Sequence, residues 1–239
     1  MTIKKFLIAF LLLIPFSVVK PWTVVVENDN FSEGIIEKFT VNKSTTPGEL
    51  PDLRLLKTAL AGYGLLKEQQ LLKRPGVITI IDYSLPSNME RLWVIDLVNA
   101  KVIYRTLVSH GRNSGDLMAE NFSNKPGSYA SSPGFYSTGE TYKGKHGLSL
   151  KLDGLEKGIN DKARERAIVV HGADYVSPCF IRQNGRLGRS LGCPAVPEKL
   201  SKDIIETIKG GSCFFIYVPK ACYTSNSTIL SRINYEPKG

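Results

Sequence analysis

Residues 167–174 read AIVVHGAD, and residues 188–194 read GRSLGCP. The first stretch is a short apolar run that predicts a buried strand with His171 at its end. The second places Cys193, 22 residues after that histidine, between a glycine and a proline. Cysteine attacks as a thiolate, and a free thiol with a pKa of about 8.5 is only a few per cent ionised near pH 7. His171 can serve as the activating base if the fold brings the two side chains together.

The residues next to Cys193 suit the same chemistry. Gly192 permits a tight turn and a close approach of the backbone to substrate, and nearby backbone N–H groups could hold an oxyanion. Ser190 belongs to the same turn, and Arg189 adds local positive potential. The stretch therefore predicts a nucleophilic site with Cys193 as nucleophile, His171 as base and Gly192 at an oxyanion-binding turn.

Short β-branched runs separated by turn residues dominate the chain on both sides of this stretch. The runs that predict strands are 77–82, 91–96, 102–108, 148–152, 167–170 and 213–218. Helical spacing of apolar residues appears from Leu53 to Tyr63, weakened by Gly62 and Gly64, and again over 197–209. Residues 111–139 are rich in Gly, Ser, Asn and Pro and predict long loops around the site. The expected fold class is α+β and β-rich.

The first 20 residues have the pattern of a targeting segment. Lys4 and Lys5 precede a 14-residue apolar run over 6–19, which suits a secretory signal and is too short to cross a bilayer. No clear cleavage site follows, so residues 1–20 are expected to be either a signal peptide or a retained signal anchor that would tie the protein to the membrane through 4–20. A polar linker is expected over 21–48 and a catalytic domain over 49–239. The protein is expected to be exported, to the periplasm or cell envelope.

Composition limits the classes of function. The 239 residues include 31 Lys and Arg against 22 Asp and Glu, giving a net charge of +9, and 42% are apolar. Collagen-like, coiled-coil, disulfide-dense and polytopic membrane proteins are excluded. Loss of residues 1–20 would remove three lysines and no acid, leaving +6. That charge suits anionic envelope polymers, and its scattered distribution argues against nucleic-acid binding.

At the histidine and cysteine stretches the sequence resembles the L,D-transpeptidase catalytic domain family. His171-Gly172 and Ser190-Leu191-Gly192-Cys193 match the family's His-Gly and Ser/Thr-x-Gly-Cys elements. Ser132-Pro133-Gly134-Phe135 approximates an upstream Pro-x-Gly-x-Phe element, and the Gly-Cys-Pro-Ala-Val ending at 192–196 is typical of one branch. The resemblance spans about 75–219. It implies a mixed β-sandwich or barrel core with a few flanking helices.

Two positions depart from the family pattern. Many members have a histidine just before Gly-Cys, where this chain has Leu191, and an arginine two residues after the cysteine, where it has Ala195. Binding of a substrate carboxylate would then depend on other residues, such as Arg189 or Arg186. The residues expected to contact the substrate are His146, Ser190, Arg189 and Gly172.

The resemblance implies cysteine-dependent acyl transfer on peptidoglycan stem peptides. No cofactor is expected, and the protein is expected to be a monomer. Cys193 would attack the bond after the third residue of a tetrapeptide and release D-alanine. An amine acceptor would then give a 3→3 crosslink or another attachment, whereas water would make the protein an L,D-carboxypeptidase. A third hypothesis is that the protein is a non-catalytic module that binds the cell wall.

The remaining histidines and cysteines allow further readings. A zinc hydrolase could use His146, His171 and either Cys193 or Asp174, but neither His-x-His nor His-Glu-x-x-His spacing occurs, so no metal is expected. Asp174 could also orient an imidazole, although a backbone carbonyl is the commoner partner in the resembling family. His110 is a further candidate for substrate contact. Export would permit a disulfide between Cys179 and Cys222, whereas Cys213 lies in an apolar run that predicts a buried, inert thiol.

Overall fold

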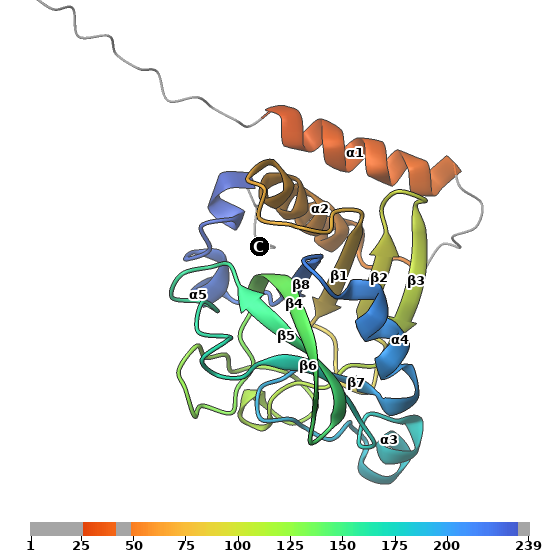
Figure 1. Cartoon of the computed structure of the whole chain (residues 1–239), viewed down its shortest axis with the longest axis vertical. Coiled ribbons are helices and arrows are strands. Elements are labelled where there is room, and N and C mark those ends of the chain that lie inside the picture. Colours follow the sequence, from red (N-terminus) through yellow and green to blue (C-terminus); the bar gives the residue numbers. More distant parts are fainter. Residues whose placement is uncertain (1–25, 42–48, 234–239) are drawn as a thin grey trace, which may run out of the picture.

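The computed structural model describes residues 26–41 and 49–233. An eight-stranded mixed sheet forms the centre of the molecule (Figure 1). Across the sheet the order is β3 (Lys101–Thr106), β2 (Leu92–Asp96), β1 (Val77–Asp82), β8 (Cys213–Tyr217), β4 (Gly134–Gly144), β5 (Gly147–Gly154), β6 (Val169–Ala173) and β7 (Ala195–Pro197). β1 with β8 and β6 with β7 are parallel pairs, and the other neighbours are antiparallel.

The two edges of this sheet approach each other and nearly close it into a barrel. Ser109, just beyond edge strand β3, donates its backbone N–H to the carbonyl of Ala195 in edge strand β7 at 2.9 Å. A second bridge joins Gly111 to Ser190. The β-rich α+β class is therefore confirmed, and the closure lies next to the stretch that carries Cys193.

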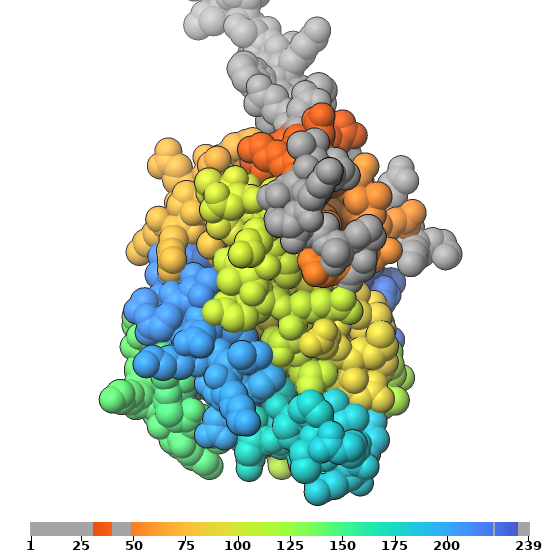
Figure 2. Space-filling model, turned by 90° about the vertical axis from the view of Figure 1, so that its right-hand side faces the viewer, coloured from red at the N-terminus to blue at the C-terminus, as the bar shows by residue number. Residues whose placement is uncertain are grey.

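Helices of 4 to 16 residues flank the sheet. They are α1 (Val26–Val41), α2 (Leu53–Glu68), α3 (Pro178–Asn184), α4 (Glu198–Ile208) and α5 (Ala221–Thr224), with 3-10 turns η1 (Arg112–Ser114) and η2 (Leu230–Ile233). Helix α4 turns Ile204, Ile205 and Ile208 inward, and all three are fully buried. Figure 2 shows the outer side of α4 (blue) at the surface, above α3 (cyan).

Helix α2 illustrates how local sequence and packing combine. The carboxylate of Asp52 accepts from the backbone N–H groups of Arg54 at 3.0 Å and Leu55 at 3.3 Å, a cap worth about 1 kcal/mol. A Cβ on Gly62 would lie 2.1 Å from the ring of Phe135, so a glycine here lets the helix approach the sheet closely. The helix therefore continues through the glycines that were expected to weaken it and ends at Glu68.

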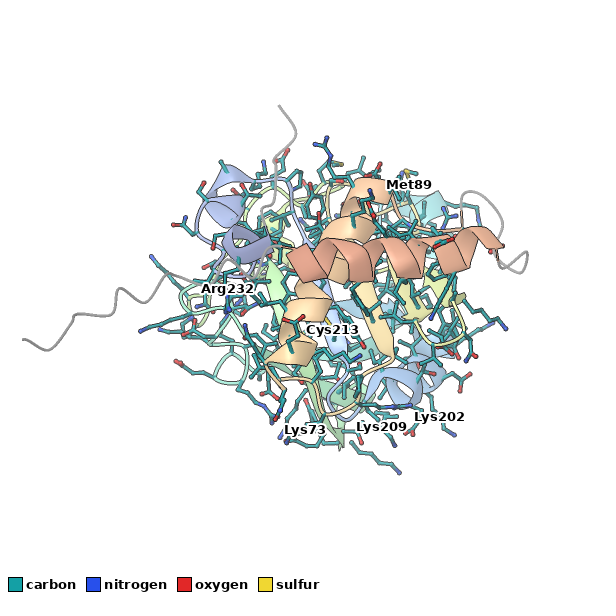
Figure 3. All side chains as sticks on the ribbon, turned by 90° about the horizontal axis from the view of Figure 1, so that it is seen from above. Lys73, Met89, Lys202, Lys209, Cys213 and Arg232 are labelled. Atoms are coloured by element: carbon teal, nitrogen blue, oxygen red, sulfur yellow. The ribbon has the colours of Figure 1, made fainter. Side chains whose placement is uncertain are left out.

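The hydrophobic core lies between the sheet and these helices. The rings of Phe135 in β4 and Phe215 in β8 stack with centroids 4.0 Å apart, and both side chains are fully buried. Cys213 lies deep in this core, as expected, and burial raises the pKa of its thiol far above the ordinary value. Figure 3 labels it within the body of the molecule, while Lys73 and Lys202 lie at the periphery.

Part of the expected linker is helical. Residues 26–41 of the stretch 21–48 form α1, which lies across α2 (Figure 1). Phe31, Ile35 and Phe39 recur every four residues and form a narrow apolar stripe in an otherwise polar segment. Phe31 stacks on Tyr63 of α2 with centroids 5.8 Å apart. The expected targeting segment 1–20 lies outside the described residues; within them, no helix combines the length and apolarity needed to span a membrane.

Two local expectations near the site were wrong. Residues 134–139, expected to be loop, belong to β4, whose register shifts between Thr138 and Thr141. Such an irregularity bends a strand. His171 lies in the middle of β6 rather than at a strand end, because pairing with Ser149 in β5 and Ala195 in β7 extends β6 to Ala173. These pairings join residues far apart in the chain, so no local pattern reveals them.

Candidate active site

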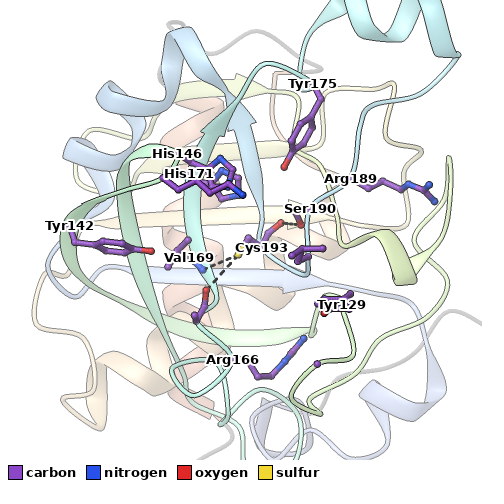
Figure 4. A pocket seen from close by; sticks show the side chains of 14 residues that line it. Tyr129, Tyr142, His146, Arg166, Val169, His171, Tyr175, Arg189, Ser190 and Cys193 are labelled. Atoms are coloured by element: carbon purple, nitrogen blue, oxygen red, sulfur yellow. Dashed lines mark hydrogen bonds between the residues drawn. The ribbon is translucent and has the colours of Figure 1, made fainter.

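One cavity of about 450 Å³ contains Cys193 and His171 together (Figure 4). This volume is in the range of small-molecule sites. The lining residues are Gly127, Tyr129, Tyr142, Lys145, His146, Arg166, Ala167, Val169, His171, Tyr175, Arg189, Ser190, Leu191 and Cys193. Three of them are cationic, and none is a carboxylate.

The turn that presents Cys193 is held by Ser190. The hydroxyl of Ser190 donates to the carbonyl of Cys193 at 2.6 Å and accepts from the N–H of Gly192 at 3.1 Å. Gly192 has a φ of 121°, which disfavours any side chain, and a Cβ there would lie 2.9 Å from the carbonyl of Ala130. The glycine in this motif is thus required both by backbone conformation and by lack of space.

The thiol of Cys193 is partly exposed at the cavity and lies against the start of β6. Its Sγ is 3.5 Å from the backbone N–H of Val169 and 3.7 Å from the carbonyl of Ala167. Burial raises the pKa of the Cys193 thiol, while the Val169 N–H and the charge of Arg166 act in the opposite direction. The thiol therefore requires help from its surroundings to ionise at neutral pH.

His171 is held in one tautomer by its own strand. Its Nδ1 lies 2.9 Å from the carbonyl of Gly172, and because a carbonyl only accepts, Nδ1 carries the proton. This leaves Nε2 unprotonated and available as a base. Burial lowers the pKa of His171, and His146 lowers it further by charge repulsion, so the ring is neutral at pH 7. No hydrogen bond joins His171 to Cys193 in the described part of the chain; the two groups share the cavity.

His146 reaches the site from the tip of the β4–β5 hairpin. Its ring stacks on that of His171 with centroids 4.5 Å apart and planes 25° apart. In Figure 4 the two stacked rings overlap, above Cys193. Although His146 is exposed and His171 is buried, the hairpin places both histidines in the same cavity.

Other residues singled out from the sequence lie elsewhere. Gly172 does not line the cavity; a Cβ there would lie 2.6 Å from the hydroxyl of Ser201, so this glycine makes room for α4. The carboxylate of Asp174 accepts from the N–H of Tyr175 at 2.7 Å and orients no imidazole. His110 is fully buried, with its Nδ1 2.8 Å from Nη2 of Arg91, and is therefore a structural residue.

Arg189 lines the cavity, whereas Arg186 does not. Both guanidinium groups face Asp116, Arg189 at 2.5 Å and Arg186 at 3.8 Å. The two positions that differ from the family pattern have different environments. Leu191 is 57% exposed and lines the cavity, whereas Ala195 is fully buried in β7. An arginine side chain at position 195 would have to fit into that packed interior.

Cys179 is exposed and has a free thiol. The side chain of Cys222, the partner that the sequence suggested, lies outside the described part of the structure. Among the residues described, no group of three or more His, Cys, Asp and Glu side chains is arranged to hold a metal ion.

Sequence reasoning missed Arg166, Tyr175 and Tyr142 at the cavity. Arg166 lies in the polar stretch before β6, where the sequence pattern predicts a solvent-exposed turn. Tyr175 follows β6, and burial together with the charge of Cys193 raises its pKa to about 12. No spacing in the sequence marks these residues; only the position of Arg166 shortly before the His171 strand could have drawn attention to it.

A nearly closed mixed sheet whose cavity contains a cysteine and a neutral histidine defines an α+β domain with a cysteine–histidine site. Comparison of the sequence with protein families identifies the family to which this domain belongs. The family model described as L,D-transpeptidase catalytic domain matches residues 49–217, and the chain belongs to this family. The match begins before α2 and ends at the last residue of β8.

The chain is also similar to solved structures, at low identity. They include an L,D-transpeptidase from Mycobacterium smegmatis (12% identity, 60% of this chain and 59% of that one, TM-score 0.37) and one from Mycobacterium tuberculosis (12%, 60% and 58%, 0.39). A third is the helical cell shape determining protein Pgp2, as a mutant, from Campylobacter jejuni (12%, 70% and 56%, 0.39). The chain thus spans less than two thirds of the length of each. No curated protein matches the sequence.

Proposed function

We propose that this protein catalyses cysteine-dependent acyl transfer on peptidoglycan stem peptides. The observation that carries the proposal is the cavity shared by Cys193 and the neutral, Nδ1-protonated His171, in a chain of the L,D-transpeptidase catalytic domain family. A thiol nucleophile and a base with a free Nε2 are the two groups that acyl transfer requires.

In the first half-reaction His171 Nε2 takes the thiol proton and Cys193 Sγ attacks the carbonyl carbon of the third residue of a tetrapeptide. The C–S bond forms, the C–N bond to D-alanine breaks, and His171 returns the proton to the leaving amine. In the second half-reaction an acceptor amine gives a proton to His171 and attacks the thioester. The acyl group passes to the amine and Cys193 is restored as a thiol.

The oxyanion of the tetrahedral intermediate requires a backbone donor near Cys193. The N–H of Gly192 is already donated to the hydroxyl of Ser190. Within the described residues, the N–H of Cys193 has no acceptor, and it belongs to the attacking residue itself. We therefore assign the oxyanion contact to the Cys193 N–H, with Gly192 shaping the turn.

The charge of the cavity supports a substrate that carries carboxylates. Lys145, Arg166 and Arg189 line it without a lining acid, and this field concentrates anionic ligands. Stem peptides carry free carboxylates and occur in the cell wall. A place for the protein in the cell envelope, reached through the apolar segment at 6–19, is consistent with this substrate and is part of the proposal.

The activity is tested with purified protein and disaccharide tetrapeptides, analysed by mass spectrometry. Crosslinked dimers with release of D-alanine identify a transpeptidase, and tripeptides alone identify a carboxypeptidase. Cys193→Ala is expected to abolish both, while Cys179→Ala, which removes an exposed free thiol, is the matched control. Turnover by Cys193→Ala would refute the assigned nucleophile, and binding without turnover by the wild type would instead indicate a wall-binding module.

A carbapenem provides an independent test of the nucleophile. The wild-type protein is expected to gain the mass of one acyl adduct, located on the peptide that contains Cys193. An adduct located on Cys179 would contradict the proposal.

A further inference from the structure

The side chain of Arg166 enters the cavity from a tight turn just before β6. Its N–H donates to the carbonyl of Lys162 at 2.9 Å, and the N–H of Ile168 donates to the carbonyl of Ala163 at 2.9 Å. Ala167, the next residue, has a φ of 52°, which ends the turn and redirects the chain into β6. The backbone therefore fixes the point from which the Arg166 side chain enters the cavity.

The guanidinium of Arg166 is anchored on a single loop. Nη1 donates to the carbonyl of Ser123 at 2.7 Å and to the hydroxyl of Ser132. Nη2 donates to the carbonyl of Ala130 at 2.5 Å and to the hydroxyl of Ser128 at 3.2 Å. All four acceptors are neutral, so no carboxylate among them offsets the positive charge of the guanidinium. The loop over 123–132 holds the guanidinium in place.

This charge lies beside the turn that presents Cys193. A Cβ on Gly192 would lie 3.3 Å from Nη2 of Arg166, and the same Cβ would lie 2.9 Å from the carbonyl of Ala130 that Arg166 binds. In Figure 4 Arg166 lies below Cys193, on the opposite side from His146 and His171. The thiol is thus flanked by a base on one side and a fixed positive charge on the other.

We propose that Arg166 is a positioning residue whose permanent charge stabilises the thiolate of Cys193. The inference rests on Cys193 being the nucleophile of the proposed function. It assigns the Cys193 thiolate a cationic partner that, unlike histidine, stays charged throughout the working pH range.

The need for such a charge follows from the burial of the site. Burial raises the pKa of Cys193 and lowers that of His171, so both effects oppose a thiolate–imidazolium pair. A nearby opposite charge favours the ionised thiol. Burial also lowers the pKa of Arg166, yet a guanidinium remains protonated near neutral pH.

Other titratable and charged groups face the cavity from several elements. They are Tyr142 on β4, Lys145 and His146 at the β4–β5 tip, His171 on β6, Tyr175 after β6, Tyr129 in the loop before β4, and Arg189 before Cys193. Of these cations, Arg189 is paired with Asp116, and Lys145 is exposed to solvent, which weakens its effect. Arg166 has no acidic partner among the described residues, lies beside the Gly192 turn, and its charge lowers the pKa of the Cys193 thiol.

The test measures the pH dependence of iodoacetamide alkylation at Cys193, followed by peptide mass mapping, without any peptidoglycan substrate. Arg166→Gln removes the positive charge. Arg166→Lys keeps the charge but lacks the planar guanidinium group that donates through both Nη1 and Nη2. Arg164→Gln is the matched control, because Arg164 lies on the same turn but pairs with Glu140 and Asp153 at the surface.

Arg166→Gln is expected to alkylate about tenfold more slowly at pH 7, the effect of losing one nearby opposite charge, with its profile displaced to higher pH. Arg166→Lys and Arg164→Gln are expected to keep the wild-type profile within about twofold. An unchanged profile in folded Arg166→Gln would overturn the proposal. If that variant does not fold, Arg166→Lys decides: a tenfold loss despite the retained charge would overturn it.

This experiment separates the inference from the proposed function. Loss of thiol ionisation in Arg166→Gln is visible even if the protein never acts on stem peptides. Conversely, a wild type that crosslinks stem peptides while Arg166→Gln keeps its alkylation profile would retain the function and refute the role of Arg166.

Discussion

The imidazole of His171 in β6 lies under that of His146 at the β4–β5 tip, with ring centroids 4.5 Å apart. The two residues are 25 positions apart in sequence and meet because β5 pairs with β6. Positive charge at His146 disfavours a proton on His171, so the hairpin tip that lines the cavity also lowers the pKa of His171.

Replacing His146 by phenylalanine keeps a ring on His171 and removes this repulsion. Because His146 lowers the pKa of His171, the variant is expected to raise it and to move the acid limb of Cys193 alkylation to higher pH. NMR titration of the His171 ring measures the same change directly. Lys143→Gln, on the same hairpin but outside the cavity lining, is the control. An unmoved His171 titration in His146→Phe would contradict this coupling.

Gly192→Ala is expected to destabilise the protein by about 2–3 kcal/mol, because the residue has a φ of 121° and a Cβ would lie 2.9 Å from the Ala130 carbonyl. The displaced turn should also slow Cys193 alkylation. Urea unfolding measures the first effect. Gly185→Ala is the matched control: its φ is 71° and its Cβ position is open, so it should cost only about 1 kcal/mol. Equal losses in the two variants would rule out the steric part of this explanation.

Ser190→Ala removes the hydroxyl that joins the Gly192 N–H to the Cys193 carbonyl. We expect a loss of about 1–2 kcal/mol in unfolding free energy and slower alkylation of Cys193, since the turn is no longer braced. Ser190→Thr keeps the hydroxyl and should restore most of both quantities. Alkylation of Ser190→Ala at the wild-type rate would show that the hydrogen bonds of the Ser190 hydroxyl do not affect the reactivity of Cys193.

Arg91→Met tests a fully buried arginine that lies outside the cavity lining. The fully buried guanidinium donates to the carbonyls of Leu85 at 2.7 Å and Val108 at 3.0 Å and to Nδ1 of His110 at 2.8 Å. Leaving these acceptors unpaired is expected to cost about 3–5 kcal/mol in urea unfolding. Arg105→Met, which removes a surface ion pair with Glu90, should cost less than about 1 kcal/mol. Similar losses in both would contradict the special role of Arg91.

His110 links stability to pH. Burial and the charge of Arg91 lower its pKa from 6.5 to about 4, so the unfolded chain binds a proton more readily than the folded one. The stability that comes from keeping the ring neutral is fully present above pH 6.5 and is lost as the pH falls towards 4, up to about 3 kcal/mol.

Urea unfolding between pH 7.5 and 5 should therefore show a smaller loss of stability on acidification in His110→Asn than in its parent. The comparison is made in a His171→Asn background, because the pKa of His171 is lowered too and acts in the same direction. Equal pH dependence with and without His110 would contradict the effect.

Local pattern was sufficient for much of the fold. The run over 77–82 forms β1 with the same bounds, and the helix expected over 197–209 is α4 at Glu198–Ile208. The first is a continuous run of mostly β-branched residues that begins after Gly76, and the second has apolar residues at helical spacing between Pro197 and Gly210. The pattern failed for α1, whose thin apolar stripe is stabilised by α2, and for β4, which is rich in Gly, Ser and Thr but is paired on both sides by β8 and β5.

The sequence by itself determined where the candidate nucleophile and base lie, because His-Gly and Ser-x-Gly-Cys are short motifs whose backbone requirements are local. The φ of Gly192 and the hydrogen bonds of Ser190 involve only neighbouring residues. Only the tertiary structure decided which other groups face the thiol. Arg166 and His146 reach the cavity through strand pairing and loop contacts between distant segments, and the burial that shifts the pKa values of Cys193 and His171 exists only once the sheet has nearly closed.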